Sequence, residues 1–359
     1  MTTAAGGNVT IEAQLRTRGR FRLDKRSRSF PPLRLNLKKK QTEGTEFEEQ
    51  DKLKIVSPCR PNRDSYEQLV LNEYLVYRTF AMITATSFQV RLARITYVDE
   101  SGDDDPFTRL AFFIENDDAL AARVGMGFEV FDIPEDKNLP LSVFEPTASQ
   151  TMAVFQYMIG NTDWSEVAGH NVEVLSISGI AVPVPYDFNF SGIVEAPYSV
   201  PDPSLGIKRV QDRMYRGWCR SNLDPEPILE RFRAAETDIM ALYRDFPYLE
   251  DGERNRSMLY LEDFFKDIAT PQRANRRFLR HFQQLPTLGS LLPLSVHGPR
   301  EHGGNGGSRA WVDVRIVPSL LRLYRRCCGI DRAPVIANDP SASTRGKCHP
   351  RFHVLPFTP

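Results

Sequence analysis

Residues Ile159 to Asn171 read I-G-N-T-D-W-S-E-V-A-G-H-N, and residues 184–192 read V-P-Y-D-F-N-F-S-G. The first stretch places Asp163 and Asn171 in a short loop after an apolar helix, and the second places Asp187 directly after an apolar strand. Turn formation alone accounts for such residue types, because Asn, Asp, Ser and Gly favour loops. The same types also supply the oxygen ligands that Mg²⁺ prefers. The two stretches therefore indicate either plain turns or a metal-dependent phosphoryl-transfer site.

The composition is that of an ordinary globular protein. The chain has 359 residues, of which 41% are apolar, which is enough for two domains or one domain with two lobes. No run approaches the roughly 18 to 20 apolar residues of a membrane span, and the first residues lack a secretory signal pattern. We therefore expect a soluble protein, cytoplasmic by default, without a membrane span. The cysteines lack a C-x-x-C pair and are predicted to be free thiols: Cys59, Cys219, Cys327, Cys328 and Cys348.

The charge is balanced overall but unevenly distributed. The formal net charge of +0 argues against a general nucleic-acid binder, and no nucleic-acid partner is expected. Residues 1–60 carry about twice as many basic as acidic side chains, whereas residues 98–150 are strongly acidic. These two regions either face each other across a cleft or form two separate solvated faces.

The first third of the chain predicts a small antiparallel sheet. Apolar and polar residues alternate over 9–23 and 33–38, which is typical of strands. A third short strand, K-L-K-I-V, contains Lys54. Two more strands, V-R-L-A-R-I-T-Y-V-D and F-T-R-L-A-F-F-I-E-N-D, flank the acidic turn E-S-G-D-D-D-P. We expect about five strands in this sheet.

A helix is predicted over about residues 65–81, with Asp64 as a candidate cap. Glu73 falls on its apolar stripe. A buried carboxylate needs a cation, because an unpaired buried charge costs several kcal/mol. We therefore expect an ion pair of Glu73 with Lys54 or Arg34, unless Glu73 lies at the edge of the stripe and reaches water.

The remainder of the chain predicts mainly helices. A helix from Pro146 leads into the first quoted loop, and two short strands, V-E-V-L-S-I and A-V-P-V-P-Y, precede the second. From about Pro203 onward the chain is predicted to be helical, with further helices at about 256–268 and 272–284.

The order of these elements is that of a protein-kinase-like fold. In such a fold, a strand Lys held by a helix Glu binds the nucleotide phosphates. A loop Asp orients the acceptor hydroxyl, while an Asn and a second Asp ligate magnesium. Phosphoryl transfer needs these groups because charge on the transferred group must be neutralised while the nucleophile is held in line.

This order predicts an α+β fold with two lobes. Residues 1–117 are predicted to form a β-rich lobe that contains one helix, and this lobe covers the nucleotide. Residues 118–285 are predicted to form a mainly helical lobe that carries the catalytic and metal loops. Residues 286–359 are rich in Pro, Gly, Ser and Arg without a sustained period, so we expect an irregular, poorly ordered tail. An altered reading frame near the end of the gene would produce a similar tail.

The quoted motifs also resemble a known family. N-T-D-W-S, H-N-V, P-Y-D-F and the upstream L-N-E-Y-L-V-Y-R are similar to motifs of the CotH-type atypical kinases, named for a spore-coat kinase, and especially of their bacterial relatives. I-G-N-T-D followed by a downstream Asn shows a weaker likeness to HipA-type kinases. The resemblance covers roughly residues 10–285. It implies ATP as co-substrate, Mg (or Mn) as cofactor and a protein acceptor.

Carried over residue by residue, the resemblance implies one catalytic residue, two metal ligands and four nucleotide-binding residues. The strand cation remains open between Lys54 and Arg34. The implied roles are catalysis by Asp163, metal binding by Asn171 and Asp187, and nucleotide binding by Arg34, Lys54, Glu73 and Glu115.

The chain also departs from the family pattern. It has no Gly-rich phosphate loop, so side chains of an arginine row (Arg16, Arg18, Arg20 and Arg22, around Gly19) would have to cover the phosphates. The second motif has Asn189 where the family has Asp, which weakens a second metal contact. The spacing from Asp163 to Asn171 is longer than in ordinary protein kinases.

These patterns predict ATP- and Mg-dependent phosphoryl transfer to a protein or other hydroxyl acceptor. Three alternatives remain open. The chain could be a catalytically inactive kinase-like scaffold, a nucleotide- or anion-binding module that uses the arginine row, or a kinase-like transferase of another group.

Overall fold

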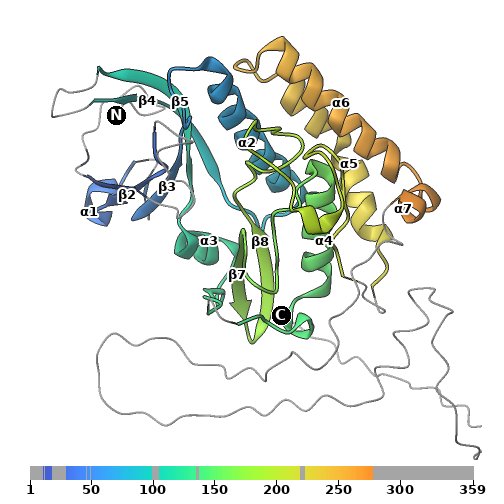
Figure 1. The fold of residues 1–359 in the computed structure, drawn as a ribbon. Helices are drawn as coiled ribbons and strands as arrows, with labels where there is room; N and C mark the ends of the chain where they lie inside the picture. Colours follow the sequence, from blue (N-terminus) through green and yellow to red (C-terminus); the bar gives the residue numbers. More distant parts are fainter. Residues whose placement is uncertain are drawn as a thin grey trace, which may run out of the picture.

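The structure of this chain, a computed structural model, describes residues 11, 13–17, 30–45, 47–48, 50–98, 105–134, 137–218 and 223–277. Strands dominate the first part and helices the rest, so the fold is α+β, in an arrangement consistent with two lobes (Figure 1). The elements are β1 (Ala13–Thr17), β2 (Leu33–Leu37), α1 (Lys39–Thr42), β3 (Lys52–Val56), α2 (Asp64–Ile83), β4 (Val90–Tyr97), β5 (Phe107–Ile114), α3 (Asp117–Val124), β6 (Glu129–Val130), η2 (Leu141–Val143), α4 (Pro146–Ile159), β7 (Val172–Ile177), β8 (Ile180–Pro185), η3 (Pro203–Leu205), α5 (Glu226–Arg244), α6 (Asp251–Ile268) and α7 (Pro271–Arg277).

The predicted small antiparallel sheet is confirmed. It has five strands in the order β1-β2-β3-β5-β4. Lys54 of β3 lies opposite Arg34 of β2 and Ile114 of β5. Side chains alternate between the two faces of a strand, and Val56 packs in the core shared with α2, whereas Ile55 belongs to a separate cluster on the other face. Lys54 therefore points to the side of the sheet where α2 lies.

Helix α2 is buried on nearly all sides. The helix predicted over 65–81 is confirmed as Asp64–Ile83, but Arg63 and not Asp64 is at its N-cap position. It packs on β4 and β5 on one side and on α5 on the other (Figure 1), and Leu71, Leu75 and Val76 are fully buried. The single apolar stripe that the sequence predicts is too narrow, because this helix contributes to the core on more than one face.

Polar contacts also tie α2 to the start of α6. Glu250 N donates to Gln68 Oε1 at 3.0 Å. Asn72 Nδ2 donates to Glu253 Oε2 at 3.2 Å, and Ser257 Oγ donates to Asn72 Oδ1 at 3.0 Å. Asn72 and Ser257 are fully buried, so these bonds satisfy polar groups that would otherwise be costly to bury.

Helix α4 begins at Pro146, as predicted, and is buried in the core of the helical part of the fold. The carboxylate of Glu145 caps its start and accepts a hydrogen bond from Thr147 N at 3.1 Å. Gly160 ends it with φ 65. Proline in the first turn and glycine after the last are common start and stop signals. All side chains over 149–159 are buried, so the helix end is firmly fixed in the core.

The two predicted strands β7 and β8 are confirmed and form a hairpin, to which β6 adds a third strand. Ser178 and Gly179 in its turn have φ values of 51 and 79, as two-residue hairpin loops require. Tyr186 N donates to Asn171 O at 3.0 Å. The hairpin therefore returns the chain so that Asp187 follows directly beside the loop that ends at Asn171.

The prediction that helical structure begins at about Pro203 is wrong, whereas the helix that follows is confirmed as α5. Within the described part of residues 203–225, the helical structure is the three-residue η3, and α5 begins at Glu226. Pro201, Pro203 and Gly206 explain the difference, since proline and glycine disfavour helix interiors. Helix α6 begins earlier than predicted, at Asp251.

Part of the sequence prediction lies outside the described residues. It includes Arg18, Gly19, Arg20 and Arg22 of the arginine row, the predicted helix beyond Arg277, the tail over 286–359 and four of the five cysteines. The fifth, Cys59, is a buried free thiol, as predicted. None of the helices in the described ranges is both long enough and apolar enough for a bilayer span.

Candidate active site

The loop after α4 is held in shape by its own first residues. Gly160 takes a left-handed conformation that glycine adopts readily. The buried Asn161 Oδ1 accepts a hydrogen bond from Asp163 N at 3.0 Å, and Asn161 O accepts one from Trp164 Nε1 at 3.1 Å. Trp164 packs in the core, whereas the side chain of Asp163 stays partly exposed. Residues 159–164 therefore form one turn that leaves the side chain of Asp163 accessible.

The side chain of Asp163 contacts the side chains of both His170 and Asn171. His170 Nε2 lies 2.8 Å from Asp163 Oδ1. Asn171 Nδ2 donates to Asp163 O at 2.7 Å and to Asp163 Oδ2 at 3.0 Å. Both of these side-chain hydrogen bonds use the amide nitrogen of Asn171. Its Oδ1 is therefore the side-chain atom that could bind a cation. Asn171 has φ 52, a conformation that Asn tolerates better than most residues.

The pKa of His170 is raised above its ordinary value. The hydrogen bond with Asp163 is the largest cause; burial opposes it, and the negative charges of Asp163 and Asp187 raise the pKa further. Asp187 therefore lies close enough to the Asp163–His170 pair to act on its protonation.

The second loop is fixed by aromatic residues of two helices. Asp187 has φ 58, which is uncommon for a residue other than glycine and is a form of strain that clusters at functional sites. Asp187 N donates to Tyr77 Oη of α2 at 2.9 Å. The next residue, Phe188, is fully buried, with its ring centroid 4.7 Å from that of Tyr77 and 5.6 Å from that of Phe155 on α4. Helices α2 and α4 together set the position of Asp187.

Asn189 contacts the carboxylate of Asp187 directly. Its Nδ2 donates to Asp187 Oδ1, which an ionised aspartate at this position could not do because it has no donor. Asn189 is buried, and its Oδ1 has no hydrogen-bond partner among the described residues. The amide of Asn189 therefore orients Asp187.

Two glycines join the quoted stretches. Gly192 N donates to Gly160 O at 3.0 Å, and Ile193 N donates to Ile159 O at 3.1 Å. A side chain at either glycine would meet the hydroxyl of Tyr260 on α6. Backbone hydrogen bonds therefore join the two stretches at Gly160 and Gly192, where there is no space for a Cβ atom.

Lys54 reaches the site from β3. Its Nζ lies 2.8 Å from Asp117 Oδ1, with 11% of the lysine side chain exposed. The ammonium also lies 4.9 Å from the ring centroid of Tyr186 and 5.4 Å from that of Phe88, within the range of cation–π attraction. Since Tyr186 precedes Asp187, the amine is next to the second loop.

The contacts of Glu73 and Arg34 differ from the expected ion pair between Glu73 and Lys54 or Arg34. Glu73 is 4% exposed, so its predicted burial on α2 is confirmed. The ion pair of Lys54 is formed with Asp117, however, and not with Glu73 as expected. The reason is that α3, which the sequence did not predict, brings a closer carboxylate. Arg34 lies beside Lys54 on β2, and its Nε is buried without a hydrogen-bond partner in the described part of the chain.

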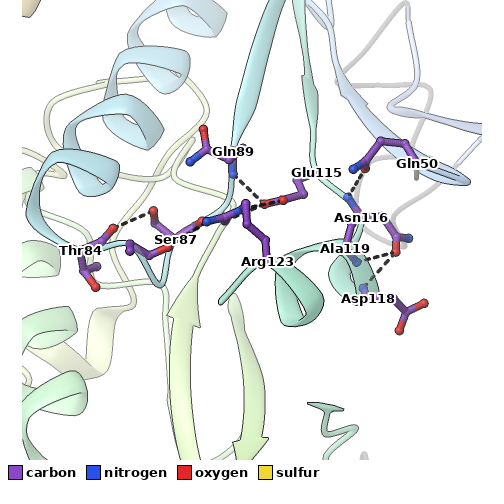
Figure 2. Close-up of polar contacts among 10 residues, drawn as sticks. Gln50, Thr84, Ser87, Gln89, Glu115, Asn116, Asp118, Ala119 and Arg123 are labelled. Carbon is purple, nitrogen blue, oxygen red and sulfur yellow. Dashed lines mark hydrogen bonds and ion pairs between the residues drawn. The ribbon is translucent and has the colours of Figure 1, made fainter. Parts of the chain in front are cut away.

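The carboxylate of Glu115 contacts Arg123 and the backbone of Gln89, just before β4 (Figure 2). Its Oε1 accepts from Arg123 Nε at 2.8 Å, and its Oε2 accepts from Arg123 Nη2 at 2.9 Å and from Gln89 N at 3.0 Å. These bonds join the end of β5 to α3 and to the residue before β4. The nucleotide-binding role expected of Glu115 gains no support from them, and we assign its side chain a structural role.

Sequence reasoning missed Arg216, which clamps the loop of Asp163. Its guanidinium donates to Thr162 O and, at 2.8 Å, to Trp164 O. Burial lowers the pKa of Arg216, and the charge of Asp163 opposes this effect. No local pattern could have revealed it, because Arg216 lies in an irregular segment more than forty residues downstream in the sequence.

Sequence reasoning also missed Glu173 on β7. Burial raises the pKa of its carboxyl from 4.5 to about 7; the charge of Asp117 adds to this shift and Lys54 opposes it. Glu173 is therefore a carboxylic acid near Lys54 and Asp117 that changes charge close to neutral pH. Its position on a short alternating strand predicts only a half-buried side chain.

This shift predicts a pH-dependent effect on stability. The folded protein holds the proton of Glu173 between pH 4.5 and about 7, where the unfolded chain has lost it, so stability falls as pH rises through this window. Glu173→Gln should match wild type near pH 5 and exceed its free energy of unfolding by up to about 3 kcal/mol at pH 8. Urea unfolding across this range measures the difference.

The matched control is Glu236→Gln, because Glu236 is exposed on α5. This variant removes an exposed carboxylate and should stay within about 0.5 kcal/mol of wild type. A Glu173→Gln difference that does not change with pH would contradict the raised pKa of Glu173.

No protein-family model matches the chain, and comparison with curated proteins gives no match. Among the described residues there is no group of three or more His, Cys, Asp and Glu side chains that could hold a metal ion.

Proposed function

We propose that this chain is a kinase-like phosphotransferase, similar to the CotH-type atypical kinases, that transfers the γ-phosphoryl group of ATP to a hydroxyl of a protein acceptor. One observation supports this proposal above the others. The Lys54 ammonium lies 4.9 Å from the ring of Tyr186, the neighbour of Asp187, and Asp187 in turn acts on the pair of Asp163 and His170. A cation, a candidate base and a candidate metal ligand thus converge from three separate segments.

In the proposed reaction, Asp163 orients the acceptor hydroxyl. A new bond forms between the hydroxyl oxygen and the γ-phosphorus, and the bond from that phosphorus to the β–γ bridging oxygen breaks, so ADP leaves. The hydroxyl proton passes to Asp163, whose carboxylate is partly exposed and already positioned by Asn171. His170 holds the other carboxylate oxygen and limits rotation of the group.

The donor atoms near Asp163 fit a hard divalent cation. Asn171 Oδ1 and the carboxylate of Asp187 are oxygen ligands of the kind that Mg²⁺ or Mn²⁺ accepts. Asn189 holds one oxygen of that carboxylate. When bound, the cation would neutralise charge on the phosphates of ATP.

Lys54 and Arg34 are the proposed phosphate-binding cations. They lie opposite each other on adjacent strands and share one face of the sheet. The buried Nε of Arg34 lacks an acceptor among the described residues, and a phosphate oxygen would supply one. Side chains can thus perform the task that backbone amides perform in folds with a Gly-rich loop.

The proposal is tested by ATP- and magnesium-dependent stabilisation. Wild-type protein should melt at a higher temperature with ATP and MgCl₂ together than with either alone, because a ligand at about 100 times its Kd adds about 2.7 kcal/mol to the free energy of unfolding. Asp187→Ala should fold and should lose this stabilisation. Differential scanning fluorimetry over a range of ATP concentrations measures both.

Asp238→Ala is the matched control, since Asp238 is exposed on α5, and it should behave like wild type. An equal rise of the melting temperature in Asp187→Ala would overturn the metal-binding role of Asp187. Absence of a rise in wild type at any ATP concentration would favour the catalytically inactive scaffold.

A further inference from the structure

We propose that Asp117 is the positioning residue of Lys54: its carboxylate holds the lysine ammonium where the phosphates of the nucleotide bind. The inference rests on the proposed function and deepens it, because it assigns to α3 a task that the sequence assigned to Glu73 on α2.

The environment of Lys54 leaves its amine one charged partner at contact distance among the described residues. Asp117 Oδ1 lies 2.8 Å from Lys54 Nζ, and the side chains are 11% and 26% exposed for the lysine and the aspartate, respectively. Tyr186 and Phe88 cover the ammonium with their rings. A half-buried ion pair of this kind is shielded from water on most sides, so it restrains the amine more than an exposed pair does.

Asp117 is itself anchored to the strand that carries Lys54. It is the first residue of α3, whose cap is Asn116. Asn116 N donates to Gln50 Oε1 at 2.9 Å (Figure 2). Asn116 Nδ2 donates to Lys52 O of β3 at 3.3 Å. The start of α3 thus moves with β3, and the distance between Asp117 and Lys54 is set by two elements that are bonded to each other.

The position of Glu73 is different. It lines a small cavity together with Ser57, Cys59 and Asn189. Asn189 connects this cavity to Asp187 through its hydrogen bond. Glu73 therefore lies in the same cavity as Asn189, which holds Asp187, whereas Asp117 contacts the amine of Lys54.

Asp118 provides a matched control for Asp117. Both acids lie in the first turn of α3, where negative charge stabilises a helix start. Asp118 is exposed, and among the described residues Asp117 is the acid within ion-pair distance of Lys54. Loss of Asp118 thus reproduces the effect on the helix without the effect on the lysine.

The first measurement is phosphate transfer with ATP. Asp117→Ala should lower kcat about 10- to 100-fold while the KM for ATP changes less than about threefold, because a displaced amine stabilises the transferred charge poorly in the transition state. Asp117→Glu should recover part of kcat, and Asp118→Ala should match wild type. A kcat of Asp117→Ala within twofold of wild type, in a preparation where Lys54→Ala loses activity, would overturn the proposal.

The second measurement does not need transfer activity. Limited acylation of the native protein with acetic anhydride, followed by mass spectrometry, reports the reactivity of each lysine amine. Acylation of Lys54 should be several times faster in Asp117→Ala than in wild type or Asp118→Ala. Unchanged labelling of Lys54 would overturn the positioning role of Asp117, whereas faster labelling in a protein that neither binds nor uses ATP would retain the ion pair's role and overturn the proposed function.

Discussion

Asp163→Asn should lower phosphate transfer about 10²- to 10⁴-fold and leave ATP binding nearly unchanged, since that is the usual contribution of a positioned acid or base. The asparagine can still accept the hydrogen bond from Asn171, whose Nδ2 lies 3.0 Å from Asp163 Oδ2, so the loop should keep its shape. An interaction made mainly in the transition state lowers kcat without weakening substrate binding. Incubation with radiolabelled ATP and candidate acceptors, with this protein itself included, measures the transfer.

Two controls sharpen this result. The melting temperature of Asp163→Asn should stay close to that of wild type, which excludes unfolding as the cause. His170→Gln keeps a polar group beside Asp163 but cannot carry a positive charge, so its kcat should fall far less than that of Asp163→Asn. Label incorporation equal in wild type and Asp163→Asn would refute the role of Asp163.

Gly160→Ala should destabilise the fold by about 2 to 5 kcal/mol. The φ value of 65 at Gly160 costs an L-residue roughly 1 to 2 kcal/mol. The new methyl group would also meet the hydroxyl of Tyr260, and overpacking costs typically about 1 to 3 kcal/mol. Tyr260 cannot easily move aside, because its hydroxyl donates to Gln211 O at 3.0 Å. Urea or thermal unfolding measures the loss.

Gly206→Ala separates the two causes. Gly206 has φ 70, and nothing lies within 4 Å of the Cβ that it lacks, so this variant carries the backbone strain alone and should lose only about 1 to 2 kcal/mol. Equal losses in the two variants would show that the contact of Gly160 with Tyr260 does not constrain the loop.

The parts of the fold that the sequence predicted are those with a strong local signal. Helix α2 and helix α4 are long and apolar, and α4 has a proline at its start and a glycine at its end. Strands β7 and β8 are short apolar runs around Ser178 and Gly179. The sequence also predicted that Asp163 and Asn171 share one loop, and the structure adds that the amide of Asn171 bonds to Asp163.

The parts that the sequence missed depend on contacts between distant segments. Nothing local distinguishes Asp117 from Asp118, because only the fold brings β3 beside the start of α3. Arg216 belongs to an irregular segment whose anchor, the loop of Trp164, lies far away in the chain. The raised pKa of Glu173 comes from burial and from Asp117, neither of which a single strand reveals.

The burial of α2 limits how this protein can be regulated. Leu71, Leu75 and Val76 are fully buried, and withdrawal of such side chains from the core costs about 1.5 to 3 kcal/mol each. A swing of α2 that exposes these three side chains would therefore cost at least about 4.5 kcal/mol before the bonds to α6 are counted. Allosteric effectors typically provide about 1 to 3 kcal/mol. A conformational switch that works by displacing this helix is thus too costly for an effector of that strength.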